Sequence, residues 1–96
     1  MAKSHPSWWV YILRCIDGKL YTGITTDRTR RLRQHNAGTA SKFTRCRRPV
    51  KMIYHKLRRS HGAALKLEAA IKALTRAAKE KLIAAAESKS VKAAAS

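Results

Sequence analysis

The stretch Val10–His35, VYILRCIDGKLYTGITTDRTRRLRQH, decides the fold of this chain. It predicts two short strands joined by a tight turn and followed by a strongly basic helix, because two aliphatic and β-branched runs flank a turn signal. Tyr11 and Tyr21 lie one on each predicted strand. Arg31 and His35 are four positions apart, so they share one face of the predicted helix. We therefore expect most of any active site to lie in this stretch.

The turn between the predicted strands, Trp8–Ile16 and Lys19–Thr25, decides which faces the two tyrosines occupy. A two-residue turn formed by Asp17-Gly18 alone places the tyrosines on opposite faces of the hairpin. An odd-length loop, or a bulge with Gly18 in the left-handed conformation, places them on the same face. A site shared by both tyrosines therefore requires a loop other than the simplest one.

The basic helix has clear end signals. Asp27 is its predicted N-cap, and Gly38 is predicted to end it. The segment Ala37–Pro49 has no hydrophobic period and much charge, so it is predicted to be a loop. Inside this segment basic residues surround Phe43, a combination that suits a nucleic-acid surface because phosphates and base faces can both be contacted. The alternative is that Phe43 caps the core and the charges are merely solvated.

A third strand is predicted over Val50–Leu57, with Val50, Met52 and Tyr54 on one face. Neither face is cleanly polar, which is typical of a strand that is covered on both sides. Two helices are predicted to follow, Gly62–Ala73 with Ser60 as its cap and Arg76–Ala86 with Thr75 as its cap.

The composition indicates one small, strongly basic domain. The chain has 96 residues, with 22 Lys and Arg against 5 Asp and Glu, and a net charge of +17. This length leaves no room for a second hydrophobic core. We predict one domain over residues 8–86, between a flexible N-terminus at 1–7 and a flexible basic tail at 87–96.

The charge excess points to a polyanionic partner. Nucleic acid ranks first, because each phosphate that a protein neutralises releases counterions. A membrane ranks lower, since no apolar run approaches the roughly 18 residues of a spanning helix and no signal peptide is visible. Cys15 and Cys46 show no metal-ligand spacing and no CxxC, and a reducing cytoplasm is the expected location. No P-loop, GxSxG or HExxH motif supports a nucleotide triphosphatase, a serine hydrolase or a zinc site.

Several candidate site residues each have a structural alternative. Arg31 and His35 could bind a phosphate and relay a proton, or form a solvated basic face. Glu68 could anchor one divalent cation that keeps most of its waters, or pair with Lys72 one turn later. The two tyrosines are either core aromatics or, with a cation nearby to favour phenolate, catalytic groups.

The order and spacing of these residues resemble the GIY-YIG nuclease domain. Its first motif appears as Trp9-Val10-Tyr11, and its second as Tyr21-Thr22-Gly23, in which Gly23 is the motif glycine. Arg31 matches the catalytic arginine of that family, His35 the frequent histidine that follows it, and Glu68 the metal-binding glutamate. The glycine and isoleucine of the first motif are here tryptophan and valine, but its tyrosine is kept.

The resemblance covers about Trp8–Ile83, nearly the whole chain. The segments Ser41–Arg45 and Lys81–Ile83 are similar to the small stand-alone bacterial branch, the YhbQ-like proteins, which is related to the Slx-type structure-specific endonuclease domain. This resemblance implies an α/β fold with a three-stranded antiparallel sheet flanked by helices. It also implies that the tyrosines converge on one site, so we predict the odd-length or bulged hairpin.

The resemblance further implies a mechanism. Glu68 would hold one Mg²⁺ or Mn²⁺, Arg31 would clamp the scissile phosphate, and either tyrosine would activate water with His35 assisting proton transfer. Nucleic acid is then expected to contact the basic surface and the phenylalanine loop, made of Arg28, Lys42, Phe43, Arg45, Arg47 and Arg48.

We therefore expect a metal-dependent endonuclease that acts on DNA, with RNA as the other substrate to consider, at particular structures and in repair or recombination. The alternative is a catalytically weak or inactive nucleic-acid-binding module of the same fold. A third reading is a basic accessory subunit, whose protein partner would supply target specificity.

Overall fold

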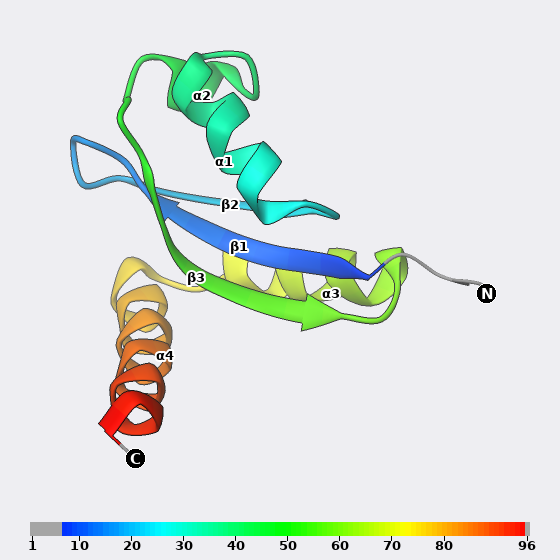
Figure 1. The fold of residues 1–96 in the computed structure, drawn as a ribbon, viewed down its shortest axis with the longest axis vertical. Helices are drawn as coiled ribbons and strands as arrows, with labels where there is room; N and C mark the ends of the chain where they lie inside the picture. The colour runs from blue at the N-terminus through cyan, green and yellow to red at the C-terminus, as the bar shows by residue number, and fades with distance from the viewer. Residues whose placement is uncertain (1–6, 96) are drawn as a thin grey trace.

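The computed structural model describes residues 7–95, with side chains described as far as Glu87. Three antiparallel strands form one sheet in the order β2-β1-β3, namely β1 (Trp8–Arg14), β2 (Leu20–Thr25) and β3 (Lys51–Arg58). The helices are α1 (Arg28–Ala37), α2 (Lys42–Arg45), α3 (His61–Lys72) and α4 (Arg76–Ala95). Figure 1 shows α1 and α2 on one side of the sheet and α3 on the other. The predicted α/β fold with a three-stranded antiparallel sheet is confirmed.

The hairpin β1-β2 has an odd-length loop, as predicted. Tyr11 pairs with Gly23, and Tyr21 pairs with Leu13. Because cross-strand partners share a face, and so do alternate residues of one strand, both tyrosines lie on the same face of the sheet. The loop spans residues 15–19, and Gly18 has a φ of 85°, in the left-handed region that favours glycine.

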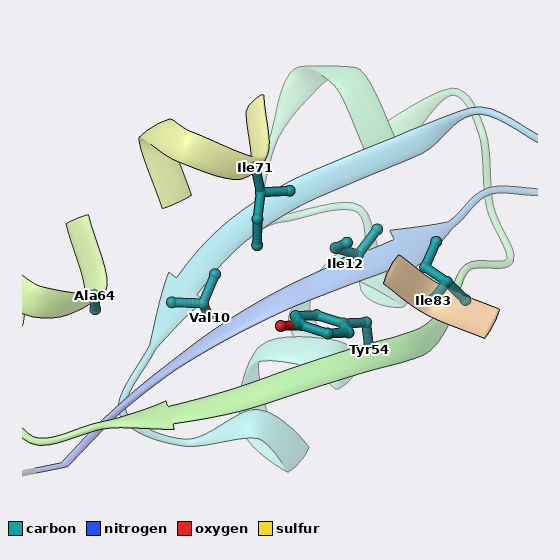
Figure 2. Close-up of a cluster of buried hydrophobic side chains, with 6 residues drawn as sticks. All are labelled: Val10, Ile12, Tyr54, Ala64, Ile71 and Ile83. Carbon is teal, nitrogen blue, oxygen red and sulfur yellow. The ribbon is translucent and has the colours of Figure 1, made fainter. Parts of the chain in front are cut away.

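The other face of β1 packs against α3 and α4. Figure 2 shows this core, in which Val10 and Ile12 of β1 cluster with side chains from β3, α3 and α4. The remaining buried members are Tyr54 of β3, Ala64 and Ile71 of α3, and Ile83 of α4. A fully buried aliphatic side chain contributes roughly 1.5–3 kcal/mol, so this face holds the sheet to the two C-terminal helices.

A bulge in β3 corrects the predicted faces of that strand. Ile12 pairs with Tyr54 and Leu13 with Met52, so Ile53 is an extra residue in the ladder. The extra residue reverses the alternation of side chains. Tyr54 therefore lies in the α3 core while Val50 and Met52 lie on the α1 side, and the prediction that all three share one face is wrong.

The segment that the sequence predicts to be a loop contains the short helix α2, and this prediction is also wrong. Ser41 caps α2 by accepting a hydrogen bond from the Thr44 amide at 3.1 Å. One helical turn is too short to show a hydrophobic period, so the cap is its only sequence signal. The predicted caps of the other helices, Asp27, Ser60 and Thr75, are confirmed, and a left-handed Gly38 ends α1 as predicted.

Helix α4 extends to Ala95, well beyond the predicted end at Ala86. The predicted tail at 87–96 falls where the structure describes mainly backbone, and the predicted flexible N-terminus at 1–7 lies outside the described residues except for Ser7. Neither cysteine forms a disulfide; Cys15 is buried and Cys46 is exposed. Among the helices that the structure describes, none combines the length and apolar character needed to cross a membrane.

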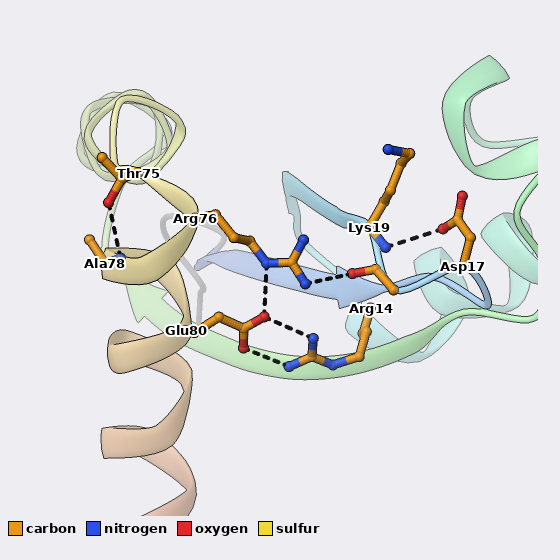
Figure 3. Close-up of polar contacts among 8 residues, drawn as sticks. Arg14, Asp17, Lys19, Thr75, Arg76, Ala78 and Glu80 are labelled. Atoms are coloured by element: carbon orange, nitrogen blue, oxygen red, sulfur yellow. Dashed lines mark hydrogen bonds and ion pairs between the residues drawn. The ribbon is translucent and has the colours of Figure 1, made fainter.

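The start of α4 is tied to the β1-β2 hairpin by Glu80 (Figure 3). The Glu80 carboxylate accepts two hydrogen bonds from the Arg14 guanidinium, at 2.9 and 3.0 Å, and one from Arg76 at 2.9 Å. Arg76 also donates to the carbonyl oxygen of Gly18 at 2.9 Å. These hydrogen bonds from Arg14 and Arg76 lower the pKa of the Glu80 carboxyl to about 2.

We expect this lowered pKa to make stability depend on acid pH. A carboxyl whose folded pKa is below its unfolded value contributes stability that is complete above the unfolded value, about 4.3, and is lost as pH falls toward the folded value. The urea midpoint of the wild-type chain should therefore fall between about pH 4.5 and 2. Glu80→Gln should lower the midpoint at neutral pH and flatten this dependence, whereas an equally steep fall in the variant would contradict the assignment.

Candidate active site

The predicted catalytic tyrosine Tyr11 is joined to the predicted histidine His35 beneath α1. The Tyr11 hydroxyl lies 2.8 Å from Nε2 of His35, although the two residues are 24 positions apart. Tyr11 is 1% exposed and His35 is fully buried. The alternative of a solvated basic face therefore does not apply to His35.

The other ring nitrogen of His35 also has a partner. Its Nδ1 lies 2.8 Å from the hydroxyl of Thr44, the buried residue of α2. The Thr44 hydroxyl in turn lies 2.9 Å from that of Ser41. A continuous hydrogen-bonded chain thus runs from Tyr11 on the central strand, through α1, to the N-cap of α2.

The environment keeps His35 neutral at physiological pH. Burial, together with the nearby positive charge of Arg31, lowers the pKa of His35 to about 4. A neutral imidazole has one N–H donor and one nitrogen lone pair, so it can accept a proton from one partner while it donates to another. This is the chemical state that proton relay requires.

Arg31 lies one helical turn before His35 and faces the same site. Burial is the main cause that raises the pKa of Tyr11, and the Arg31 guanidinium opposes this by lowering it. Arg31 Nη1 donates to the Gln34 side chain at 3.0 Å, whereas its buried Nε has no hydrogen-bond partner among the described residues. A buried N–H without a partner is costly, and an anionic ligand would satisfy it.

Tyr21 lies beside the same cluster. Its ring centroid is 6.5 Å from that of Tyr11 and 5.2 Å from that of His35. On its far side it stacks on Phe43 of α2, at 5.9 Å. Tyr21 is half-buried, so of the two tyrosines it is the more accessible.

Gly23 allows Tyr11 to occupy this position. A Cβ atom at residue 23 would lie 2.6 Å from the Tyr11 hydroxyl oxygen and 2.7 Å from its Cζ atom. These separations are far inside van der Waals contact, and the Tyr11 ring is held by burial and by its hydrogen bond to His35. The motif glycine is therefore a packing requirement of the tyrosine opposite it.

We expect Gly23→Ala to displace Tyr11 and to destabilise the fold by about 1–3 kcal/mol, as overpacking usually does. Urea unfolding measures the loss. Gly62→Ala is the matched control, because a Cβ at that position meets nothing within 4 Å. A Gly23 variant as stable as this control would show that the clash is relieved at no cost.

Glu68, the predicted metal ligand, lies on α3. Its negative charge is one of the causes that raise the pKa of Tyr11. Its side chain is 18% exposed, and its carboxylate lies 3.3 Å from Lys72 Nζ, so the structure contains the ion pair that was the alternative. Within the described part of the chain, no three His, Cys, Asp or Glu side chains are grouped to hold a metal.

The predicted nucleic-acid residues lie in two places. Arg28 lies apart from the others, where its guanidinium covers the Trp9 ring at 3.7 Å and Nη1 meets Nδ1 of His55 at 3.1 Å. The rest are on or next to α2, namely Lys42, Phe43, Arg45, Arg47 and Arg48.

The basic residues near α2 differ in whether their side chains are held by contacts within the protein. Arg47 stacks over the Phe43 ring at 4.1 Å and pairs with the Asp17 carboxylate at 3.1 Å. Arg48 donates to the Arg45 carbonyl at 2.9 Å. Lys42 and Arg45 are exposed. Phe43 is 36% exposed, so it both covers Tyr21 and presents apolar surface to solvent.

Sequence reasoning missed Thr44 and the contact between the rings of Trp9 and His55, whose centroids are 5.5 Å apart. The Ser41-x-x-Thr44 spacing is a helix-cap signal that could have indicated α2 and hence a buried threonine. His55 could not have been placed, because the bulge at Ile53 decides that it pairs with Tyr11.

Comparison with known proteins identifies the family of the chain. The family model described as the GIY-YIG catalytic domain matches residues 7–81. Members of this family are nucleases that act on nucleic acid and generally depend on a divalent metal ion. The match spans the tyrosines, Arg31, His35 and Glu68.

Small relatives match most of the chain. A UPF0213 protein of Pectobacterium carotovorum is 48% identical over 79 residues, which cover 82% of this chain and 80% of that protein. One of Desulfotalea psychrophila is 46% identical and covers 85% of this chain and 76% of its own length. The solution NMR structure of a UPF0213 protein from Bacillus halodurans has a TM-score of 0.54 at 40% identity, covering 81% of this chain and 83% of that one. The chain therefore belongs to the GIY-YIG catalytic domain family, in its UPF0213 group of small proteins.

Proposed function

We propose that this chain is a divalent-metal-dependent endonuclease that hydrolyses phosphodiester bonds in DNA, at branched, nicked or flapped structures, in repair or recombination. One observation carries the proposal. A tyrosine hydroxyl is hydrogen-bonded to a buried, neutral histidine beside an arginine whose buried Nε has no partner among the described residues. This arrangement supplies a proton acceptor and an anion-binding group at one point.

Arg31 binds the scissile phosphate. Its Nε–H has no partner among the described residues, and a guanidinium can donate two parallel hydrogen bonds to phosphate oxygens. Its charge opposes the negative charge that grows on the phosphate in the transition state.

Tyr11 accepts the proton of the attacking water. As the water oxygen bonds to phosphorus, its proton passes to the Tyr11 oxygen and the phenol proton passes to Nε2 of His35, 2.8 Å away. The bond from phosphorus to the leaving oxygen breaks, and that oxygen takes a proton from solvent. Tyr21 has no such acceptor among the described residues, and its half-buried ring stacks on Phe43 instead.

Glu68 is the residue that would hold the metal ion. A single carboxylate suits Mg²⁺ or Mn²⁺, which keep several waters and take further oxygens from the substrate phosphate. The half-buried position of Glu68 near Tyr11 fits this role, and Lys72 must yield its ion pair. When bound, the ion supplies Lewis-acid stabilisation of charge on the phosphate and the leaving oxygen.

Two clusters that combine an aromatic ring with an arginine support the preference for DNA with unpaired bases. The first is Trp9 with Arg28, and the second is Phe43 with Arg47. Aromatic and guanidinium planes stack on unpaired bases, while lysines and arginines contact the backbone. A uniform duplex offers no unpaired base to either cluster.

Cleavage of labelled flap, fork, nicked and plain duplex DNA tests the proposal. The wild-type chain should cut near the junction in Mg²⁺ or Mn²⁺, and EDTA should abolish the cuts. Matched RNA substrates show whether the deoxy sugar is required. Equal cleavage of plain duplex would contradict the structural preference.

A binding module without activity would give a different result. It would bind the same substrates with an affinity that falls steeply as salt rises, and it would leave every strand intact in either metal. Recovery of cleavage only after adding a cell extract would indicate that a protein partner completes the site.

A further inference from the structure

We propose that Thr44 is a positioning residue that fixes the tautomer of His35, with the proton on Nδ1 and the lone pair on Nε2. This inference rests on the proposed function for its catalytic consequence. Its geometric content, the protonation of one named nitrogen, is independent of that function.

Every donor in the hydrogen-bond chain has an acceptor when Nδ1 of His35 carries the proton. With the proton on Nδ1, Tyr11 donates to Nε2 at 2.8 Å and Nδ1 donates to the Thr44 hydroxyl at 2.8 Å. The Thr44 hydroxyl then donates to Oγ of Ser41 at 2.9 Å. Each of these three donors has an acceptor, as buried polar groups require.

The opposite direction leaves a proton without an acceptor. If Nε2 carried the proton, it would donate to the Tyr11 oxygen, and Thr44 would donate to Nδ1. In the free chain, where Tyr11 is only 1% exposed, the Tyr11 hydroxyl proton would then have no acceptor among the described residues. An unsatisfied buried donor costs roughly 1–3 kcal/mol, so the first direction is favoured.

Thr44 is well placed to hold this arrangement. It is fully buried, and its backbone amide donates to the Ser41 side chain that caps α2. Both its hydroxyl and its backbone are therefore anchored to the same short helix. A histidine that ligand or solvent could reach would be free to change tautomer, but His35 is fully buried.

The consequence for the reaction is that Nε2 is ready to accept the phenol proton. With the lone pair on Nε2, the proton of Tyr11 can move to His35 while the Tyr11 oxygen takes one from water. With the proton on Nε2, this transfer is blocked. Thr44 touches neither water nor phosphate in this scheme, and it acts only through His35.

NMR of the imidazole nitrogens in the intact chain tests the assignment directly. Long-range proton–nitrogen correlations distinguish a protonated ring nitrogen from one with a lone pair. In the wild-type chain near pH 7, His35 should show a protonated Nδ1 and an unprotonated Nε2. A protonated Nε2 as the major form would overturn the inference, whether or not the chain cleaves DNA.

Variants connect the tautomer to rate. Thr44→Val removes the hydroxyl at nearly constant volume, so we expect the population of the Nδ1-protonated form to fall. We expect kcat to drop roughly 10- to 100-fold, as it does when other residues that orient a functional histidine are replaced. KM should change little. Thr44→Ser should restore both readouts. Thr39→Val is the matched control. The Thr39 hydroxyl donates a solvent-exposed hydrogen bond to the backbone carbonyl of Gln34, in the same region, and has no hydrogen bond to His35.

The outcomes separate the two proposals. If the wild type and Thr44→Ser have the predicted tautomer but no chain cleaves DNA, the nuclease proposal fails and the positioning assignment stands. If Thr44→Val keeps the wild-type tautomer and kcat, the positioning assignment fails and the nuclease proposal is unaffected. If Thr44→Val does not fold, the tautomer of His35 measured in the wild-type chain decides whether the positioning assignment stands.

Discussion

Arg31→Ala should reduce the rate of DNA cleavage by about 10²–10³-fold, the effect of removing one donor that stabilises transition-state charge. Arg31 is half-buried, and its Nε has no partner among the described residues, so the free protein holds a binding group for an anion. The loss should appear mainly in kcat, because the charge on the phosphate grows in the transition state. Single-turnover cleavage of a flap substrate in Mg²⁺ measures it.

Arg33→Ala is the matched control for this variant. It removes the same charge from the same helix, but Arg33 is exposed. We expect it to weaken binding modestly and to leave the rate at saturation near that of the wild type. Equal losses for the two arginines would show that Arg31 acts only through net charge, which would contradict its place in the site.

Glu68→Gln should abolish metal-dependent cleavage, with a loss of roughly 100-fold or more, since the substitution keeps the shape and removes the charge that holds the ion. DNA binding in EDTA should be unchanged or slightly tighter, because a negative charge is removed. Titration of activity with Mn²⁺ measures any residual affinity for metal.

Lys72→Met distinguishes a metal ligand from a structural ion pair. Both substitutions break the contact between Lys72 Nζ and the Glu68 carboxylate at 3.3 Å. If Glu68 serves α3 only through this surface ion pair, in which the Lys72 side chain is 57% exposed, both variants should behave alike, and a pair of this kind contributes little. If Glu68 holds the ion, Lys72→Met should stay active and should require less metal, because it removes a competing cation.

Much of the fold follows from local chemistry in the sequence. Asp27, Ser60 and Thr75 cap helices where their side chains can accept orphan amides, and Gly38 ends α1 with a positive φ. The hairpin register could not be decided from the turn residues, which allow more than one loop. It was predicted only because the resemblance required the tyrosines to meet.

The missed features depend on tertiary contacts. The bulge at Ile53 adds one residue to a strand whose faces are both partly apolar, so alternation could not reveal it. Helix α2 is a single turn with no period. The burial of His35 could not be predicted either, because α1 is polar almost throughout and a lone histidine carries no signal of depth.

In the candidate site, too, some features could be predicted from the sequence and others depend on tertiary contacts. The sequence supplied the residue types and, through the resemblance, their expected roles. The structure adds that Tyr11, rather than Tyr21, has the histidine as its partner, and that a threonine lies behind that histidine. Hydrogen-bond partners so far apart in the chain depend on packing, which no local pattern specifies.

The Arg28 cation over the Trp9 ring has an optical consequence. Indole emission responds to a charge at 3.7 Å, so the fluorescence of Trp9 reports where the Arg28 side chain is. When a DNA phosphate draws the guanidinium away, the emission spectrum should shift. Trp8, the neighbouring fluorophore, packs on His61 instead, with ring centroids 4.4 Å apart. A Trp8→Phe chain would thus carry a single tryptophan, next to Arg28, whose selectively excited emission would make substrate arrival visible without a dye.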